Sequence, residues 1–167
     1  YKSLSVLDGA GFHGGYNHIV YQMVGQPLGV FYLPHSTGLE SDGNGGYTYG
    51  IADLNGGGVS LEDGEDRYVA GQAVPKTILG SNISFRYKRF DLSLQVNGAF
   101  GHKIYNGTSL TYMNMNIFPD YNVMKKAPKQ NIKDQTATDY WLEKGDYVNF
   151  DYVTMGWNVQ IEKVQKL

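Results

Sequence analysis

A glycine-rich segment carries the residues best suited to hold a metal ion. Asp53-Leu-Asn-Gly-Gly-Gly-Val59 places the oxygen-bearing side chains of Asp53 and Asn55 at alternate positions. Such oxygens can converge on one calcium ion because glycine permits the sharp turn of a calcium loop. The fifth position is Gly57, however, and Gly64 stands where the closing carboxylate of such a loop belongs. A solvated acidic loop is therefore the favoured interpretation, with calcium at Asp53 and Asn55 as the weaker alternative.

Catalytic patterns are weak in this chain. The densest group of acidic side chains lies in the same glycine-rich loop, where a carboxylate pair suited to glycoside hydrolysis would be hard to hold rigidly. The chain contains neither a nucleophile elbow nor a P-loop. We therefore do not predict an enzyme. A hydrolase stays as a rival interpretation, which turnover of a glycan by the purified chain would reveal.

Two further motifs favour structural roles. The four histidines show neither i, i+4 nor H-x-H spacing, and no cysteine is present to complete a site, so no metal cluster is predicted. The segment 9–14 matches G-x-G-x-x-G, a pattern that binds dinucleotides only between a strand and a helix. A β-branched apolar run follows it instead of a helical pattern, so we expect a turn there.

Aromatic side chains in otherwise polar segments are the candidate ligand-binding residues. They are Tyr47, Tyr49, Phe118 and Trp141. Such rings can stack on a sugar or pack against a partner protein, and they can equally anchor their own loops. The sequence leaves both interpretations open.

The elements that would position these residues are β-strands. Alternation of apolar and polar residues predicts two strands, Thr77 to Tyr87 and Phe90 to Gly98, each with one apolar and one polar face. Only Lys88 and Arg89 separate them, which predicts an antiparallel hairpin with a short connection. Aromatic rings stand at the turn end of both strands, as they would at a lipid–water boundary.

Other segments also carry strand patterns. Ser3 to Leu7, His18 to Val24 and Tyr147 to Gln160 are strand candidates, and Ile161 to Leu167 is expected to form a short turn. In the third candidate the apolar positions change parity between Tyr152 and Val153. A change of parity turns the apolar face over, so we expect a β-bulge or a membrane boundary at this point.

Composition and loop lengths narrow the class of protein. The 167 residues include 22 glycines and 14 tyrosines, which favours an all-β chain with long loops, and the net charge of -2 gives no basic field for nucleic acid. Segments 33–70 and 105–139 are long polar connections, whereas the hairpin turn is very short. Outer-membrane barrels combine short periplasmic turns with long extracellular loops. No apolar run is long enough for a transmembrane helix, although barrel strands need only about 9–11 residues.

Three blocks in sequence order carry a resemblance to a known family. The central block runs from Gly71-Gln-Ala-Val-Pro-Lys76 through Phe85-Arg-Tyr-Lys-Arg-Phe-Asp-Leu-Ser-Leu94 to Gly98-Ala-Phe-Gly101. Gly25-Gln-Pro-Leu-Gly-Val-Phe-Tyr32 precedes it, and Tyr140-Trp-Leu-Glu-Lys-Gly-Asp-Tyr147 with Val153-Thr-Met-Gly-Trp157 follows it. Together these blocks resemble the SusC/RagA family of TonB-dependent outer-membrane transporters.

The resemblance implies an all-β fold: an antiparallel segment of a large transmembrane outer-membrane β-barrel, from its C-terminal part. Residues 1–167 would form a partial barrel, a fragment without the plug domain and the terminal strands. From the lengths of the connections, segments 33–70 and 105–139 are expected to be extracellular loops, with Lys88 and Arg89 on the periplasmic side. This barrel would sit in outer-membrane lipid.

The resemblance also implies a function and partners. A transporter of this family imports oligosaccharides or peptides, a SusD-like surface lipoprotein closes its mouth, and TonB supplies force through the N-terminal part. The alternative is a soluble secreted β-sandwich that binds carbohydrate. Such a module would bury the apolar face of Phe90, Leu92, Leu94 and Val96 against a second sheet.

Overall fold

The structure is a computed structural model that describes residues 19–61 and 65–159. The predicted strand at Ser3–Leu7, the glycine motif at 9–14 and the predicted turn at 161–167 lie outside the described residues. The chain divides into two compact units. We name residues 75–101 and 146–167 the sheet unit, and residues 1–74 and 102–145 the mixed unit.

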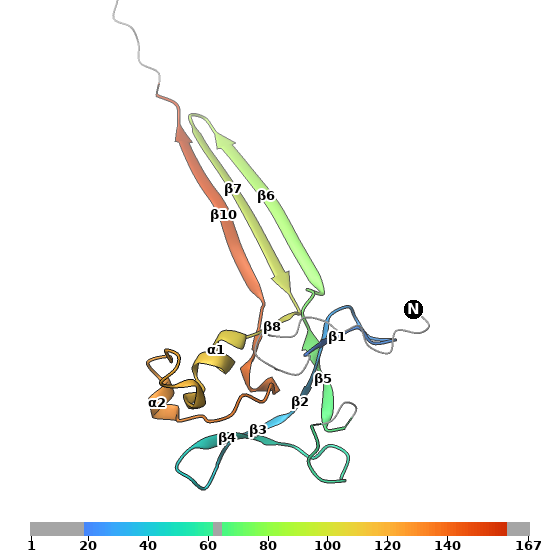
Figure 1. Ribbon diagram of the computed structural model, residues 1–167. Helices are drawn as coiled ribbons and strands as arrows, with labels where there is room; N and C mark the ends of the chain where they lie inside the picture. The colour runs from blue at the N-terminus through green and yellow to red at the C-terminus, as the bar shows by residue number, and fades with distance from the viewer. Residues whose placement is uncertain (1–18, 62–64, 160–167) are drawn as a thin grey trace, which may run out of the picture. The chain divides into compact units, whose positions relative to one another are not determined.

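The sheet unit is a three-stranded antiparallel sheet with the order β10-β7-β6 (Figure 1). Its strands are β6 (Thr77–Tyr87), β7 (Phe90–Phe100) and β10 (Tyr147–Trp157). Tyr87 pairs with Phe90, so the connection is the two residues Lys88 and Arg89. Lys88 takes a φ of 53°, the left-handed conformation that tight hairpin turns use. The predicted hairpin is therefore confirmed, and within the described residues the sheet is open, with free edges on β6 and β10.

A close approach within this sheet requires a glycine at position 98. A Cβ atom on Gly98 would lie 2.9 Å from the carbonyl oxygen of Tyr147 and 3.0 Å from the ring of Phe100. Real Cβ atoms are essentially never found so close to backbone, so only glycine lets β7 and β10 pair here while the Phe100 ring lies over the strand.

The described residues of the mixed unit form three small antiparallel sheets. The first has the order β1-β2-β5, the second pairs β3 with β4, and the third pairs β8 with β9. The strands are β1 (Val20–Tyr21), β2 (Val30–Pro34), β3 (Ser36–Ser41), β4 (Tyr47–Ile51), β5 (Arg67–Gln72), β8 (Lys103–Tyr105) and β9 (Leu142–Lys144). The strand predicted over His18 to Val24 is shorter than expected: within the described residues only Val20 and Tyr21 pair with β2, and a turn begins at Val24.

Short helices follow β8 in the same unit. They are α1 (Gly107–Tyr112), η1 (Met115–Ile117), α2 (Ala127–Gln130) and η2 (Asp139–Trp141). Asn106 caps α1, since its side chain accepts a 2.9 Å hydrogen bond from the backbone N–H of Ser109. Ile132 pairs with both Tyr47 and Asn114, which ties the helical segment to β4.

The core of the mixed unit joins segments from all along its sequence. Its buried members come from the strands near the start of the unit and from the helical segment near its end: Ile19, Phe31, Leu33, Tyr49, Ala70, Leu110, Ile132 and Ala137. Segments 33–70 and 105–139 therefore contain strands and helices with a shared core. Their composition predicts surface loops with local turns, because glycine and polar residues far outnumber the few apolar residues that build this core.

Candidate functional site

The sheet unit presents one continuous apolar face. Pairing places the apolar residues of all three strands on the same side of the sheet: Leu79, Ile83, Phe85 and Tyr87 in β6, Phe90, Leu92, Leu94 and Val96 in β7, and Val148, Phe150, Val153, Met155 and Trp157 in β10. Most of these side chains are exposed, up to 73% for Trp157. Apolar surface of this extent is normally an interaction surface in a native protein.

Three aromatic side chains form a row at one end of this face. Tyr87 pairs with Phe90, and Phe90 pairs with Trp157 on its other side, so the three rings cross all three strands beside the two-residue turn. All three are exposed. Rings that are apolar on the face and polar at the tip, such as Tyr and Trp, are enriched at lipid–water boundaries.

A β-bulge keeps the apolar face continuous in β10. Phe150 pairs with Val96 and Tyr152 pairs with Gln95, so Asp151 is the extra residue. Without this extra residue, the apolar side chains on one side of the bulge would point to the opposite face of the sheet. Of the two outcomes expected from the parity change in the sequence, the β-bulge is found, but at Asp151 rather than between Tyr152 and Val153, so Tyr152 lies on the polar face and not on the apolar face.

The opposite face of the sheet is polar. Asp151 accepts hydrogen bonds from the side-chain amides of Asn97, at 2.6 Å, and Asn149, at 3.0 Å. Tyr152 lies on this face as well, and its hydroxyl accepts a 2.8 Å hydrogen bond from the amide of Asn82. The bulge thus adds Asp151 to a face that carries amides and hydroxyls together with the charged side chains of Arg86 and Asp91.

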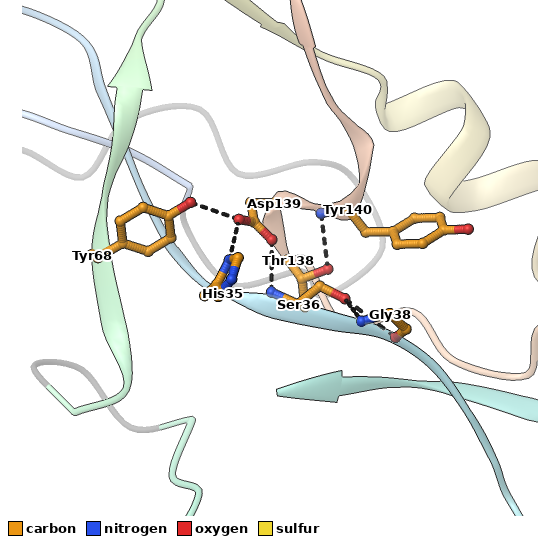
Figure 2. Close-up of polar contacts among 7 residues, drawn as sticks. All are labelled: His35, Ser36, Gly38, Tyr68, Thr138, Asp139 and Tyr140. Carbon is orange, nitrogen blue, oxygen red and sulfur yellow. Dashed lines mark hydrogen bonds and ion pairs between the residues drawn. The ribbon is translucent and has the colours of Figure 1, made fainter. Parts of the chain in front are cut away.

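In the mixed unit, one carboxylate connects three distant segments (Figure 2). Asp139, in η2, accepts hydrogen bonds from the Tyr68 hydroxyl at 2.6 Å and from the backbone N–H of Ser36 at 2.7 Å. The Nδ1 atom of His35 lies 2.7 Å from the same carboxylate. We call these four residues the Asp139 junction. Because Asp139 is largely buried, each of these contacts holds its segment in place.

Burial and hydrogen bonding set the ionisation of this junction. Burial raises the pKa of Tyr68 to about 12, with further contributions from its hydrogen bond to Asp139 and from the charge of that group. Burial also acts to raise the pKa of Asp139, but the hydrogen bonds from Tyr68, Ser36 and His35 outweigh it and hold the pKa below its ordinary value. At neutral pH, Asp139 is therefore ionised and Tyr68 keeps its proton.

The aromatic residues singled out from the sequence fall into two groups. Tyr49 is buried and its hydroxyl accepts a 2.7 Å hydrogen bond from Nε1 of Trp141, while its ring lies 5.3 Å from that of Tyr140. These contacts anchor β4 to η2. Tyr47 and Phe118 are exposed, so their rings remain accessible to a ligand or a partner.

The glycine-rich loop is organised by its own hydrogen bonds. The carboxylate of Asp53 accepts hydrogen bonds from the backbone N–H groups of Gly56 and Gly58, at 2.6 and 3.0 Å. Asn55 donates its side-chain amide to Glu65 and accepts from the N–H of Gly57 at 2.8 Å. Calcium binding at Asp53 and Asn55 stays a prediction, and among residues 19–61 and 65–159 no three His, Cys, Asp or Glu side chains group closely enough to hold a metal ion.

Asp66 is the buried anchor of this loop, and sequence reasoning missed it. Its carboxylate accepts hydrogen bonds from the N–H groups of Ser60 and Leu54, both at 2.7 Å, and of Asn55. The bond from Ser60, followed by that from Leu54, lowers the pKa of Asp66 against the opposing effect of burial. The available signal was its place directly before strand β5, at the end of the glycine-rich loop.

Sequence reasoning also missed the Asp139 junction, because nothing local in the sequence connects its members. A small pocket of about 200 Å³ adjoins the junction, with His35, Leu54 and Tyr68 among its walls.

In the part of the chain that the structure describes, no helix has both the length and the apolar character needed to cross a membrane.

Comparison with known proteins adds one relative. The chain is 28% identical over 156 residues to "TonB-dependent receptor P3" of Formosa agariphila, an alignment that covers 81% of this chain and 15% of that protein. No family model and no solved structure matches the chain. This chain spans about 15% of the length of its relative. It is a distant homologue of a TonB-dependent receptor.

Proposed function

We propose that the chain forms part of the barrel wall of a bacterial outer-membrane transporter. The observation that carries the proposal is the two-faced sheet: an exposed apolar face that runs over all three strands, opposite a face of polar and charged side chains. Strands that meet lipid on one side and an aqueous lumen on the other need this alternation. Homology to a TonB-dependent receptor supports the same assignment.

The dimensions of the sheet unit support a membrane position. Each of its three strands has 11 residues. At about 3.4 Å per residue such a strand spans about 37 Å, and at a tilt of about 45° it covers about 26 Å of bilayer thickness. This matches the apolar band of about 25 Å on outer-membrane barrels. The row of Tyr87, Phe90 and Trp157 then lies at one boundary of that band.

The order of the connections supports an orientation. The start of β6, the end of β7 and the start of β10 lie at the same end of the sheet, and all three lead into the mixed unit. At the other end, β6 and β7 are joined by the two-residue turn of Lys88 and Arg89, beside which β10 ends. Since barrels keep short turns in the periplasm and long connections outside, we place segments 33–70 and 105–139 outside the cell.

For the whole transporter we propose membership of the SusC/RagA family. It would import oligosaccharides or peptides together with a SusD-like surface lipoprotein, with TonB supplying energy. The support is the order of the three sequence blocks, and the homology to a TonB-dependent receptor agrees with it. The exposed rings of Tyr47 and Phe118 are the candidate contacts to ligand or lipoprotein.

A spin-label experiment tests the lipid-facing assignment. The chain contains no cysteine, so single-cysteine variants can carry a nitroxide at one chosen position in the protein embedded in outer-membrane vesicles. Matched pairs are Ile83→Cys with Ser84→Cys and Met155→Cys with Thr154→Cys. We expect the apolar member of each pair to be relaxed by oxygen, which concentrates in lipid, and the polar member by a water-soluble nickel chelate.

The same measurement separates the rival sandwich. In a soluble module the labels at Ile83 and Met155 would lie against a second sheet, shielded from both agents. That pattern, or extraction of the protein from cells without detergent, would overturn the proposal. The structure favours the barrel wall, because side chains on this face, such as Phe85, Phe150 and Met155, are more than half exposed.

A further inference from the structure

Four Asn-Gly pairs give the chain a chemical reactivity that the proposed transport function does not use. They are Asn44-Gly45, Asn55-Gly56, Asn97-Gly98 and Asn106-Gly107. The backbone nitrogen that follows an asparagine can attack the carbon of the side-chain amide and release ammonia, and glycine shields that nitrogen least because it has no side chain. The attack needs a mobile amide and a glycine N–H that no hydrogen bond holds, so the fold selects among the four pairs.

Two of the pairs lie in regular secondary structure. Asn97 and Gly98 are in β7, the central strand of its sheet, which pairs with β6 on one side and with β10 on the other. Asn106 caps α1: its Oδ1 accepts from the N–H of Ser109 at 2.9 Å, and its Nδ2 donates to Glu143 at 2.8 Å. These contacts must break before either side chain can turn onto the following nitrogen.

The pair in the glycine-rich loop is exposed but held by hydrogen bonds. Gly56 donates its N–H to the carboxylate of Asp53 at 2.6 Å, which engages the attacking nitrogen. Asn55 accepts from the N–H of Gly57 at 2.8 Å and donates its amide to Glu65, which engages the group under attack. Each bond of ordinary strength that must break first slows the reaction by about fivefold. Exposure alone therefore does not make this pair reactive.

Asn44 and Gly45 are held least of the four pairs. Both residues are exposed, in the turn that joins β3 to β4. Within residues 19–61 and 65–159, neither the N–H of Gly45 nor Oδ1 of Asn44 has a hydrogen-bond partner. The amide nitrogen of Asn44 donates to the carbonyl oxygen of Asp42 at 3.4 Å, which is long for such a bond.

The surroundings of this turn leave the approach open. A Cβ atom on Gly45 would have no neighbour within 4 Å, so nothing crowds the attacking nitrogen. The carboxylate of Asp42 accepts from the backbone N–H groups of Asn44, at 2.7 Å, and Gly46, at 2.8 Å. These bonds hold the main chain on both sides of the pair and engage neither the nitrogen of Gly45 nor the side-chain carbonyl of Asn44.

We propose that Asn44 is the site at which the folded chain deamidates spontaneously, through a succinimide formed with Gly45. The nitrogen of Gly45 bonds to Cγ of Asn44 and loses its proton to water, while the Cγ–Nδ2 bond breaks and the amide leaves as ammonia. Water then opens the ring. Addition at Cγ gives aspartate, and addition at the backbone carbonyl carbon gives isoaspartate, whose main chain runs through the side-chain carbons.

The products change the turn that carries the site. Both add a negative charge close to Asp42, and isoaspartate also inserts an extra carbon into the main chain. The turn is fastened to the helical segment by two bonds: the Asn131 side-chain amide donates to the Gly45 carbonyl at 2.5 Å, and the Tyr47 N–H donates to the Asn131 carbonyl at 3.0 Å. Conversion to isoaspartate therefore displaces a carbonyl that joins the two segments.

The test follows deamidation by mass spectrometry in the full chain, kept folded in detergent micelles at mildly alkaline pH. Samples are digested with pepsin in acid, where the reaction is slow, and fragmentation locates each asparagine whose NH₂ group has been replaced by OH. We expect Asn44 to react at least about fivefold faster than each of the other three asparagines. Both aspartate and isoaspartate should form at position 44.

The matched control is the same chain unfolded in denaturant, which keeps every Asn-Gly pair and removes the hydrogen bonds. There the four rates should agree within about threefold. Asp53→Ala frees the N–H of Gly56 and should raise the rate at Asn55 in the folded chain at least about threefold.

Two outcomes would overturn the proposal. One is a folded chain in which another pair reacts as fast as Asn44 or faster. The other is an unchanged rate at Asn55 in the Asp53→Ala variant, because hydrogen bonds would then not select the site. The readout does not depend on a membrane position, so it is independent of the spin-label test of the barrel wall.

Discussion

Tyr68 and Asp139 lie 71 positions apart in the sequence, and the hydroxyl of the first donates a 2.6 Å hydrogen bond to the carboxylate of the second. This bond joins β5 to η2 across the mixed unit. The Asp139 junction therefore resists separation of the two halves of that unit, which surround the central hairpin in the sequence. The contribution of the junction should be measurable as a change in the free energy of unfolding when one of its contacts is removed.

Removal of this hydrogen bond should weaken the mixed unit. Tyr68→Phe keeps the ring and deletes only the donor, and we expect a loss of about 1 kcal/mol, since the bond involves a charged acceptor but is partly exposed to solvent. Denaturant unfolding of the chain, followed by fluorescence, measures the change. Tyr112→Phe, at an exposed position, is the control and should change stability by less than about 0.5 kcal/mol. A neutral result for Tyr68→Phe would show that water replaces the bond fully.

At alkaline pH, the free energy of unfolding should depend on the ionisation of Tyr68. Its pKa is raised to about 12 from an ordinary value of 10.0, so the folded state favours the protonated phenol. The stabilisation is therefore complete below pH 10 and disappears as the pH rises through about 12. Unfolding free energies measured across this range should fall more steeply for the unchanged chain than for Tyr68→Phe. Parallel curves would contradict the assignment.

At acidic pH, the free energy of unfolding should depend on the ionisation of Asp139. Because its pKa is lowered in the folded state, its contribution is present above the ordinary carboxyl pKa and is lost as the pH falls through the lowered value. Asp139→Asn should remove this part of the acid dependence and destabilise the unit at neutral pH by about 1–3 kcal/mol. Asp120→Asn, on the exposed surface, is the control. Unfolding at several acidic pH values distinguishes the two.

Deletion of Asp151 should be tolerated better than deletion of Thr154. Loss of the bulge residue leaves every other pair of β7 and β10 in register, at the cost of the bonds from Asn97 and Asn149. Deletion of Thr154 instead moves Met155 and Trp157 to the polar face. The measurement is the fraction of each variant recovered folded in the outer membrane. Equal recovery would mean that the apolar face is not under the constraint we describe.

A methyl group at position 98 should disturb the sheet, and one at position 80 should not. A Cβ on Gly98 meets the Tyr147 carbonyl at 2.9 Å, whereas a Cβ on Gly80 has no neighbour within 4 Å. We expect Gly98→Ala to destabilise the sheet unit by about 1–3 kcal/mol and Gly80→Ala to be neutral or slightly stabilising. Thermal unfolding in detergent compares the two. A neutral Gly98→Ala would show that β10 can shift to make room.

The sheet unit was readable from sequence because its information is local. Alternation predicted the faces of Thr77 to Tyr87 and Phe90 to Gly98, the two-residue spacing predicted their pairing, and the parity change after Tyr152 indicated a bulge close to its actual place at Asp151. The mixed unit was not readable in this way. His35 and Asp139 are 104 positions apart and share no periodic pattern, and Trp141 reaches Tyr49 across 92. Such contacts depend on tertiary packing, and no local propensity encodes them.

The divided layout of the mixed unit has a consequence for the order of events during synthesis. Its core needs Ile19 and Phe31 from early in the chain and Ile132 and Ala137 from late in it, with both hairpin strands made in between. Early segments must wait, with apolar side chains still unsatisfied, until nearly the whole chain has emerged. A holding chaperone would be most needed in that interval, and a purified chain truncated before η2 should bind it more tightly than the full chain does.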